Sequence, residues 1–134
     1  MFRWLDREKP RPLTGAPVVR RQKTYSAQSG YVYQYYYEGQ RPAERDHEHG
    51  VEYVFDSSAD RKTSFPVSVF VSEVAVSAWQ QRHGHDLTSS ERYAIAKMAL
   101  FQAFDERETP AQMKKEVRVR PADVEAILET LGVD

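Results

Sequence analysis

The sequence of 134 residues contains no cysteine. Disulfides, zinc–thiolate sites and thiol catalysis are therefore excluded. No apolar run approaches the ~20 residues that a membrane-spanning helix needs. The N-terminus is charged from Arg3 onward and lacks the apolar core of a signal peptide. We expect a cytoplasmic protein that makes no membrane contact.

The common catalytic motifs are also missing. The chain has no glycine-rich phosphate loop, no G-x-S-x-G turn and no H-E-x-x-H helix. Ser89 and Ser90 are better explained as helix-capping residues than as nucleophiles. The acidic residues from Asp105 to Glu108 are spaced like a solvated helix face. We therefore expect a protein without catalytic residues or a cofactor.

Positive charge is concentrated at the start of the chain. Residues 1–24 contain seven basic and two acidic residues, a net charge of +5, whereas the remainder contains twelve basic and eighteen acidic residues, a net charge of −6. The first 24 residues also include three prolines and show no helical or alternating period. We interpret residues 1–24 as a basic, proline-containing arm and residues 25–134 as a single domain.

Several stretches alternate in the manner of strands. Residues 29–38, 51–57 and 65–71 predict three strands, and residues 117–119 predict a short edge strand. The segment 39–50, GQRPAERDHEHG, has no large apolar residue, so we expect an exposed, mobile loop. Short connections between the strands favour an antiparallel meander.

The stretch from Thr88 to Glu108 predicts the central helix of the domain. Thr88 and Glu91 fit a capping box, and no glycine or proline interrupts the run. Apolar residues cover most of the helix circumference, which is typical of a helix buried by several neighbours. We expect Leu100 and Phe104 to lie in the core.

Three further segments complete the predicted fold. Residues 72–83 have helical spacing but contain β-branched residues, so helix and strand both stay open. Residues 110–115 predict one or two helical turns, and residues 121–131 predict the last helix. The whole pattern predicts an α+β fold, with an antiparallel sheet of three to four strands packed against two to three C-terminal helices.

The tyrosine-rich strand is the strongest candidate for a partner-binding surface. Tyrosine is enriched at protein interfaces because it buries a large ring and keeps a polar tip. Trp4 belongs to an apolar cluster at the tip of the arm, where such clusters often dock. The sequence therefore favours a non-catalytic protein-binding or accessory module that contacts another protein or a second copy of itself. The candidate partner-binding residues are Tyr31, Tyr33, Tyr35, Tyr36, Tyr37 and Trp4.

One alternative is a nucleic-acid-binding module. Arg20, Arg21 and Lys23 lie just before the tyrosine-rich strand, and basic side chains beside aromatic rings bind single strands through phosphate contacts and stacking. The acidic balance of the remaining chain disfavours this function.

A second alternative is a metal-dependent enzyme. His47 and His49 form one H-x-H pair, and His83 and His85 form another. On an extended segment this spacing places both rings on one side, so the two pairs together would satisfy a zinc or iron site. Both pairs fall in predicted loops or at a helix end, where histidine is commonly solvated. This alternative requires the two pairs to meet in space.

Overall fold

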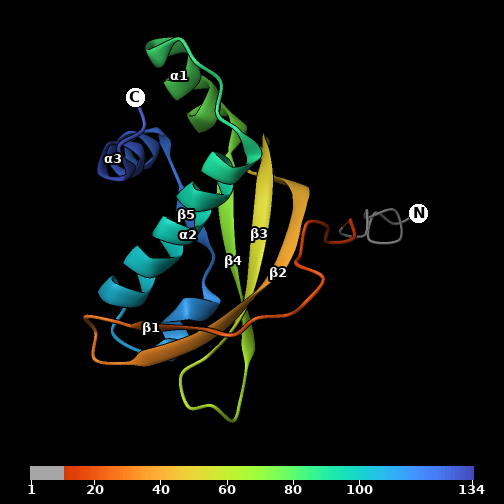
Figure 1. The fold of residues 1–134 in the computed structure, drawn as a ribbon, viewed down its shortest axis with the longest axis vertical. Helices are drawn as coiled ribbons and strands as arrows, with labels where there is room; N and C mark the ends of the chain where they lie inside the picture. The colour runs from red at the N-terminus through yellow and green to blue at the C-terminus, as the bar shows by residue number, and fades with distance from the viewer. Residues whose placement is uncertain (1–10) are drawn as a thin grey trace.

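The computed structural model describes residues 11–134. Trp4 lies outside the described residues, so its predicted role stays a prediction. Figure 1 shows the arrangement of the elements. In chain order they are β1 (Lys23–Ser26), β2 (Val32–Arg45), β3 (Glu48–Ser58), β4 (Phe65–Ser72), α1 (Glu73–His83), α2 (Ser89–Glu106), the 3-10 helix η2 (Pro110–Lys114), β5 (Val117–Val119) and α3 (Pro121–Leu131).

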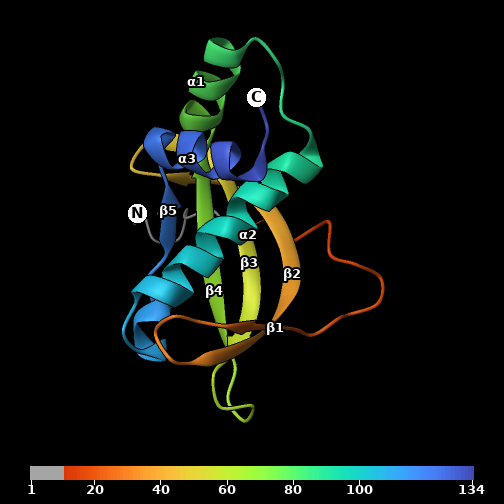
Figure 2. The same ribbon diagram turned by 60° about the vertical axis from the view of Figure 1, so that its left-hand side comes forward.

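The fold is α+β, and its sheet has five strands in the order β1-β2-β3-β4-β5. The first four strands are antiparallel neighbours, whereas β5 pairs with β4 in parallel. The prediction of a purely antiparallel sheet of three to four strands is therefore wrong in strand number and in pairing. A parallel pair needs a long crossover, and α1, α2 and η2 supply it. Figure 2 shows β5 at the outer edge of the sheet.

The predicted loop at residues 39–50 is mostly strand. Residues 39–45 extend β2 and residues 48–50 begin β3, so only Asp46 and His47 remain as a two-residue turn. Both turn residues have positive φ, 53° and 69°, as a type I′ hairpin turn requires. Pairing between β2 and β3 satisfies the backbone hydrogen bonds whatever the polarity of the side chains. The polar composition of residues 39–50 therefore did not exclude a strand.

The central helix α2 lies across the inner face of the curled sheet (Figure 1). Thr88 accepts a hydrogen bond from the Glu91 amide at 3.1 Å, and the Glu91 carboxylate accepts one from the Thr88 amide at 2.9 Å. The predicted capping box is thus confirmed. Leu100 and Phe104 are fully buried, and the Phe104 ring stacks on Tyr33 with 3.9 Å between ring centroids.

The shorter helices complete the core, with α1 packed against α3 and β3, and α3 packed against α2. Residues 73–83 form α1, which settles the choice between helix and strand, and Gly84 ends it with a φ of 66°. Trp79 turns inward from α1 and is 2% exposed. The predicted helical turns after Thr109 and the predicted last helix are confirmed as η2 and α3.

The outer face of the sheet carries polar and charged side chains. Glu52 lies near its centre with 7% exposure and accepts hydrogen bonds from Arg41 at 2.8 Å and from Ser68 at 2.6 Å. Burial opposes ionisation of Glu52, but these hydrogen bonds and the nearby arginines outweigh burial and lower the pKa of the carboxyl group. These groups form an ordered charge network on the outer face, beside the buried side chains of Val54 and Phe70.

Candidate functional site

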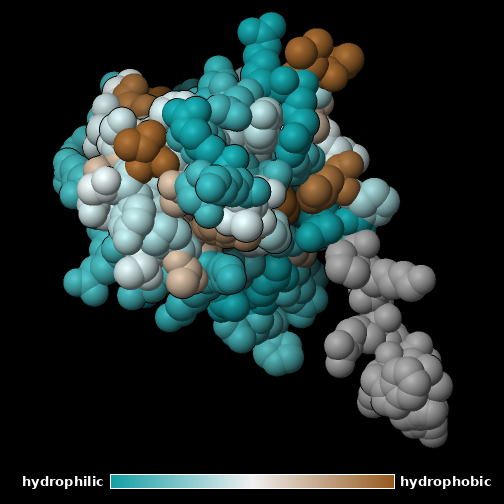
Figure 3. Space-filling model, turned by 90° about the horizontal axis from the view of Figure 1, so that it is seen from below, coloured by the Kyte–Doolittle hydropathy of each residue, from teal (hydrophilic) through white to brown (hydrophobic). Residues whose placement is uncertain are grey.

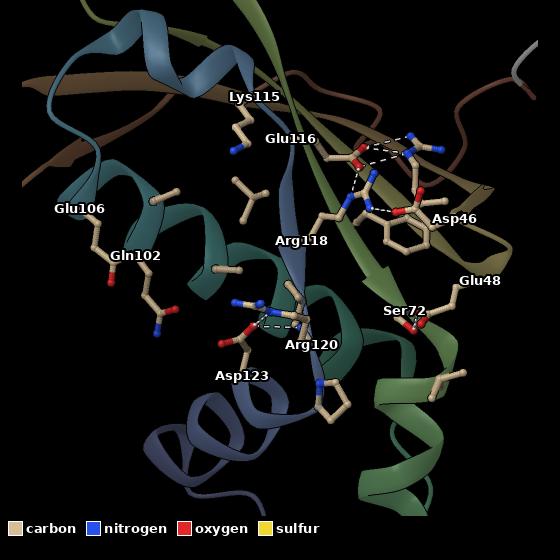
Figure 4. A pocket seen from close by; sticks show the side chains of 18 of the residues that line it. Asp46, Glu48, Ser72, Gln102, Glu106, Lys115, Glu116, Arg118, Arg120 and Asp123 are labelled. Atoms are coloured by element: carbon tan, nitrogen blue, oxygen red, sulfur yellow. Dashed lines mark hydrogen bonds and ion pairs between the residues drawn. The ribbon is translucent and has the colours of Figure 1, made fainter.

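A hollow of about 950 Å³ follows the open edge of β5 (Figure 4). It is bounded by α2, the start of α3 and the tip of the β2–β3 hairpin. The side chains of Val117 and Val119 are buried, while Arg118 between them is exposed. On an edge strand, alternate residues direct their N–H and C=O groups away from the sheet. Backbone hydrogen-bonding groups therefore lie beside the hollow.

A chain of ion pairs joins β5 to the hairpin tip. The guanidinium of Arg45 donates to both carboxylate oxygens of Glu116, with Nε–Oε1 at 3.0 Å and Nη2–Oε2 at 2.9 Å. Arg118 donates to Glu116 at 3.2 Å and to Asp46 at 2.5 Å. The hydrogen bonds with Glu116 raise the pKa of Arg45, although its partial burial opposes them. These ion pairs thus connect β5, which forms one wall of the hollow, to the end of β2 and the hairpin turn.

Arg107 fixes the backbone that leads into β5. Its guanidinium donates to the carbonyl oxygens of Gln112 at 2.9 Å and of Lys115 at 2.5 Å. Burial lowers the pKa of Arg107, and the attraction of Glu106 opposes this shift. The hydrogen bonds from the partly buried Arg107 guanidinium to these backbone carbonyls hold η2 against the end of α2. The edge strand is therefore presented in one fixed position, which reduces the ordering cost of binding.

The predicted nucleic-acid residues fall into two different environments. Arg20 pairs with Glu38 and with Asp56 on the outer face and lies 3.9 Å over the Tyr36 ring. Arg21 and Lys23 instead line a groove on the helix side of the sheet. The structure does not bring the three basic residues together on one surface.

The predicted partner-binding tyrosines divide between the core and the surface. Tyr33 and Tyr35 are 0% and 3% exposed, because α2 covers the side of the strand that carries them. Their rings are thus not available to a partner. Tyr37 is half-buried, Tyr36 donates a hydrogen bond to Gln22 at 3.1 Å, and Tyr31 is 38% exposed. Partner contact through Tyr31 or Tyr36 stays a prediction.

The histidine pairs make separate contacts. His83 stacks on Trp79 with 4.3 Å between ring centroids and hydrogen-bonds to Glu125 at 3.1 Å. His47 and His49 lie at the tip of the β2–β3 hairpin and border a hollow beside the first part of α1. Among residues 11–134, no three side chains of His, Cys, Asp or Glu are placed to hold a metal ion. The joint metal site that the enzyme alternative requires is not formed by these residues.

The residues that build the β5 hollow were not predicted as a site. The alternation of Val117 and Val119 with arginines did predict an edge strand, and charged residues are a usual feature of such edges. The parallel pairing with β4, which brings Arg118 beside the hairpin tip, has no signal in the local sequence.

Comparison with protein-family models, with curated proteins and with solved structures found no match. No helix in the described part of the chain is long and apolar enough to cross a membrane.

Proposed function

We propose that this protein is a non-catalytic protein-binding module that takes an extended segment of a partner protein alongside β5. The observation that carries the proposal is the open edge of β5 beside the hollow (Figure 4). Strand addition uses the backbone groups of the edge for affinity and nearby pockets for side-chain specificity. Because β5 has only three residues, the hollow must supply much of the contact.

The charge of the hollow indicates the kind of segment that fits. Its lining contains equal numbers of basic and acidic side chains, and most are paired with one another. A neutral lining gives no long-range attraction to a polyanion, which disfavours nucleic acid at this place. A peptide segment of mixed polarity suits it better. The basic lining residues are Arg45, Arg107, Lys115, Arg118 and Arg120, and the acidic ones are Asp46, Glu48, Glu106, Glu116 and Asp123.

The distribution of apolar residues on the surface favours a partner that pairs with the β5 backbone over one that binds an apolar patch. Figure 3 shows a largely hydrophilic face on which apolar residues form separate spots. Among the strongly exposed apolar residues, Val18 and Val19 are neighbours in the segment before β1, whereas Val74 lies on α1. Single exposed apolar residues are ordinary on soluble proteins and do not mark an interface.

The proposal is tested by filling the hollow with a large side chain. Gln102 is exposed on α2 and lines the hollow, so Gln102→Trp fills it without changing the core. Peptides selected on the wild-type protein from a displayed random library are expected to bind Gln102→Trp at least ~10-fold more weakly, about 1.4 kcal/mol. The matched control is Gln28→Trp, at an exposed position in the β1–β2 turn that does not line the hollow.

Two outcomes would overturn the proposal. One is a selection that enriches no peptide, and the other is a set of peptides that bind Gln102→Trp as tightly as the wild type. Sedimentation of the purified protein identifies a second copy as the occupant if self-association occurs in the wild type and is lost in Gln102→Trp.

A further inference from the structure

A groove separate from the β5 hollow lies where residues 15–23 pass the first turns of α2. It encloses about 580 Å³. It is lined by Arg21 and Lys23, by Ser89 and Ser90 at the start of α2, and by tyrosines of β2 and α2. Its lining contains two basic residues and no acidic residue. The groove shares no residue with the hollow along β5.

The cations of this groove have no counter-charge within residues 11–134. Arg20 is neutralised by Glu38 and Asp56, whereas neither Arg21 nor Lys23 forms an ion pair with any described residue. Lys23 also lies close enough to Lys97 of α2 to lower the pKa of the Lys97 ammonium, in addition to the larger effect of burial. Like charges held close together are unfavourable unless an anion lies between or beside them.

The start of α2 contributes hydrogen-bond donors to the residues that line the groove. Ser89 and Ser90 are the first two residues of α2, and their amides have no acceptor among the described residues, because the Thr88 hydroxyl takes only the amide of Glu91. The free amides at the start of an 18-residue helix attract negative charge.

Tyr35 supplies an independent indication of a ligand. It is 97% buried and lines the groove, yet its hydroxyl forms no hydrogen bond within the described part of the chain. Lys23 is its direct partner across β1 and β2, so the ammonium and the ring lie on the same face of the sheet. Burial raises the pKa of Tyr35 to about 12, so the hydroxyl stays protonated and able to donate even at moderately alkaline pH.

We propose that this groove binds the phosphate group of a small molecule, held by Arg21, Lys23 and the first turn of α2, with the Tyr35 hydroxyl as a further donor. The two unpaired cations match a phosphate, which carries close to two negative charges at neutral pH, better than a carboxylate with one. The half-buried rings of Tyr37 and Tyr93, 4.8 Å apart between centroids, give the organic part of a phosphate monoester an apolar surface to rest on.

The experiment is calorimetric titration of the full chain with AMP, with inorganic phosphate and with adenosine. Saturable binding of AMP and no binding of adenosine are expected. AMP binding more tightly than inorganic phosphate identifies a phosphate monoester as the ligand class, and equal affinities identify free phosphate. If neither AMP nor inorganic phosphate binds saturably at concentrations up to ~5 mM, which would mean a Kd weaker than millimolar, the proposal is overturned.

Variants locate the binding and separate it from non-specific attraction. Lys23→Gln is expected to weaken AMP binding at least ~10-fold, as expected for loss of a charge-assisted contact. Tyr35→Phe should weaken binding severalfold without lowering the unfolding temperature, since its hydroxyl makes no hydrogen bond with residues 11–134 and Tyr35 lines the groove. The matched control is Lys62→Gln, an exposed lysine in the β3–β4 turn. Equal weakening by Lys62→Gln and Lys23→Gln would contradict a specific site.

Discussion

Replacing Tyr33 by phenylalanine is expected to stabilise the protein. Tyr33 is completely buried and its ring stacks on Phe104, but its hydroxyl has no hydrogen-bond partner among the described residues. A buried hydroxyl without a partner costs about 1–3 kcal/mol in proteins, and the same desolvation raises the pKa of Tyr33. Tyr33→Phe removes the hydroxyl and keeps the ring, so the free energy of unfolding should rise by about 1 kcal/mol.

Urea unfolding followed by circular dichroism at neutral pH measures this change, and a gain of 1 kcal/mol corresponds to ~3–5 °C in Tm for a chain of this length. The control is Tyr36→Phe, because Tyr36 lies on the opposite face and donates a hydrogen bond to Gln22. Its effect should stay within ~0.5 kcal/mol. If Tyr33→Phe lowered the unfolding free energy by more than ~0.5 kcal/mol, the hydroxyl would have a partner and the reasoning would be refuted.

Three further predictions concern the core, a close contact and alkaline pH. Phe104→Ala should lower the unfolding free energy by ~3–5 kcal/mol in urea titrations, since it leaves a cavity among stacked rings; a loss below ~1 kcal/mol would contradict the assigned packing. Gly50→Ala should lower it by ~1–3 kcal/mol, because a Cβ there would lie 2.4 Å from the Val71 carbonyl oxygen, and an unchanged Tm would show that the strands separate freely. Stability should fall as pH rises from about 10 to about 12, since burial raises the pKa of Tyr35 and Tyr53 to about 12 while the unfolded chain ionises near 10; urea midpoints that stay level across pH 9–11 would argue against it.

Local signals were sufficient to predict α2, η2 and α3, whereas the choice between helix and strand for α1 stayed open in the sequence. The capping box of α2 links Thr88 to a residue three positions away, and both of its hydrogen bonds are present. Pro121 begins α3 and Gly132 ends it with a φ of 77°. Such start and stop features depend on contacts within one turn, so they can be identified in the sequence without knowledge of the fold.

The strands depended more on distant partners. Residues 39–45 are polar and include Pro42, yet they pair with β3 residue by residue, with Pro42 opposite Val51. Their alternation is weak because one side faces the outer charge network, and a strand with no clear apolar face is poorly identified by its own residues. The parallel pairing of β5 depended on the crossover through α1, α2 and η2, which no local pattern specifies.

The same division holds for the candidate sites. The sequence by itself determined the α+β class, the central helix and the residues that carry charge and hydroxyl groups. Only the tertiary structure decided which of those groups are paired. Arg20 meets Glu38 and Asp56, whereas Lys23 faces Tyr35 and the start of α2. The reason is physical, because an ion pair or a hydrogen bond forms only over a few ångströms, and the chain's topology sets that separation for residues far apart in sequence.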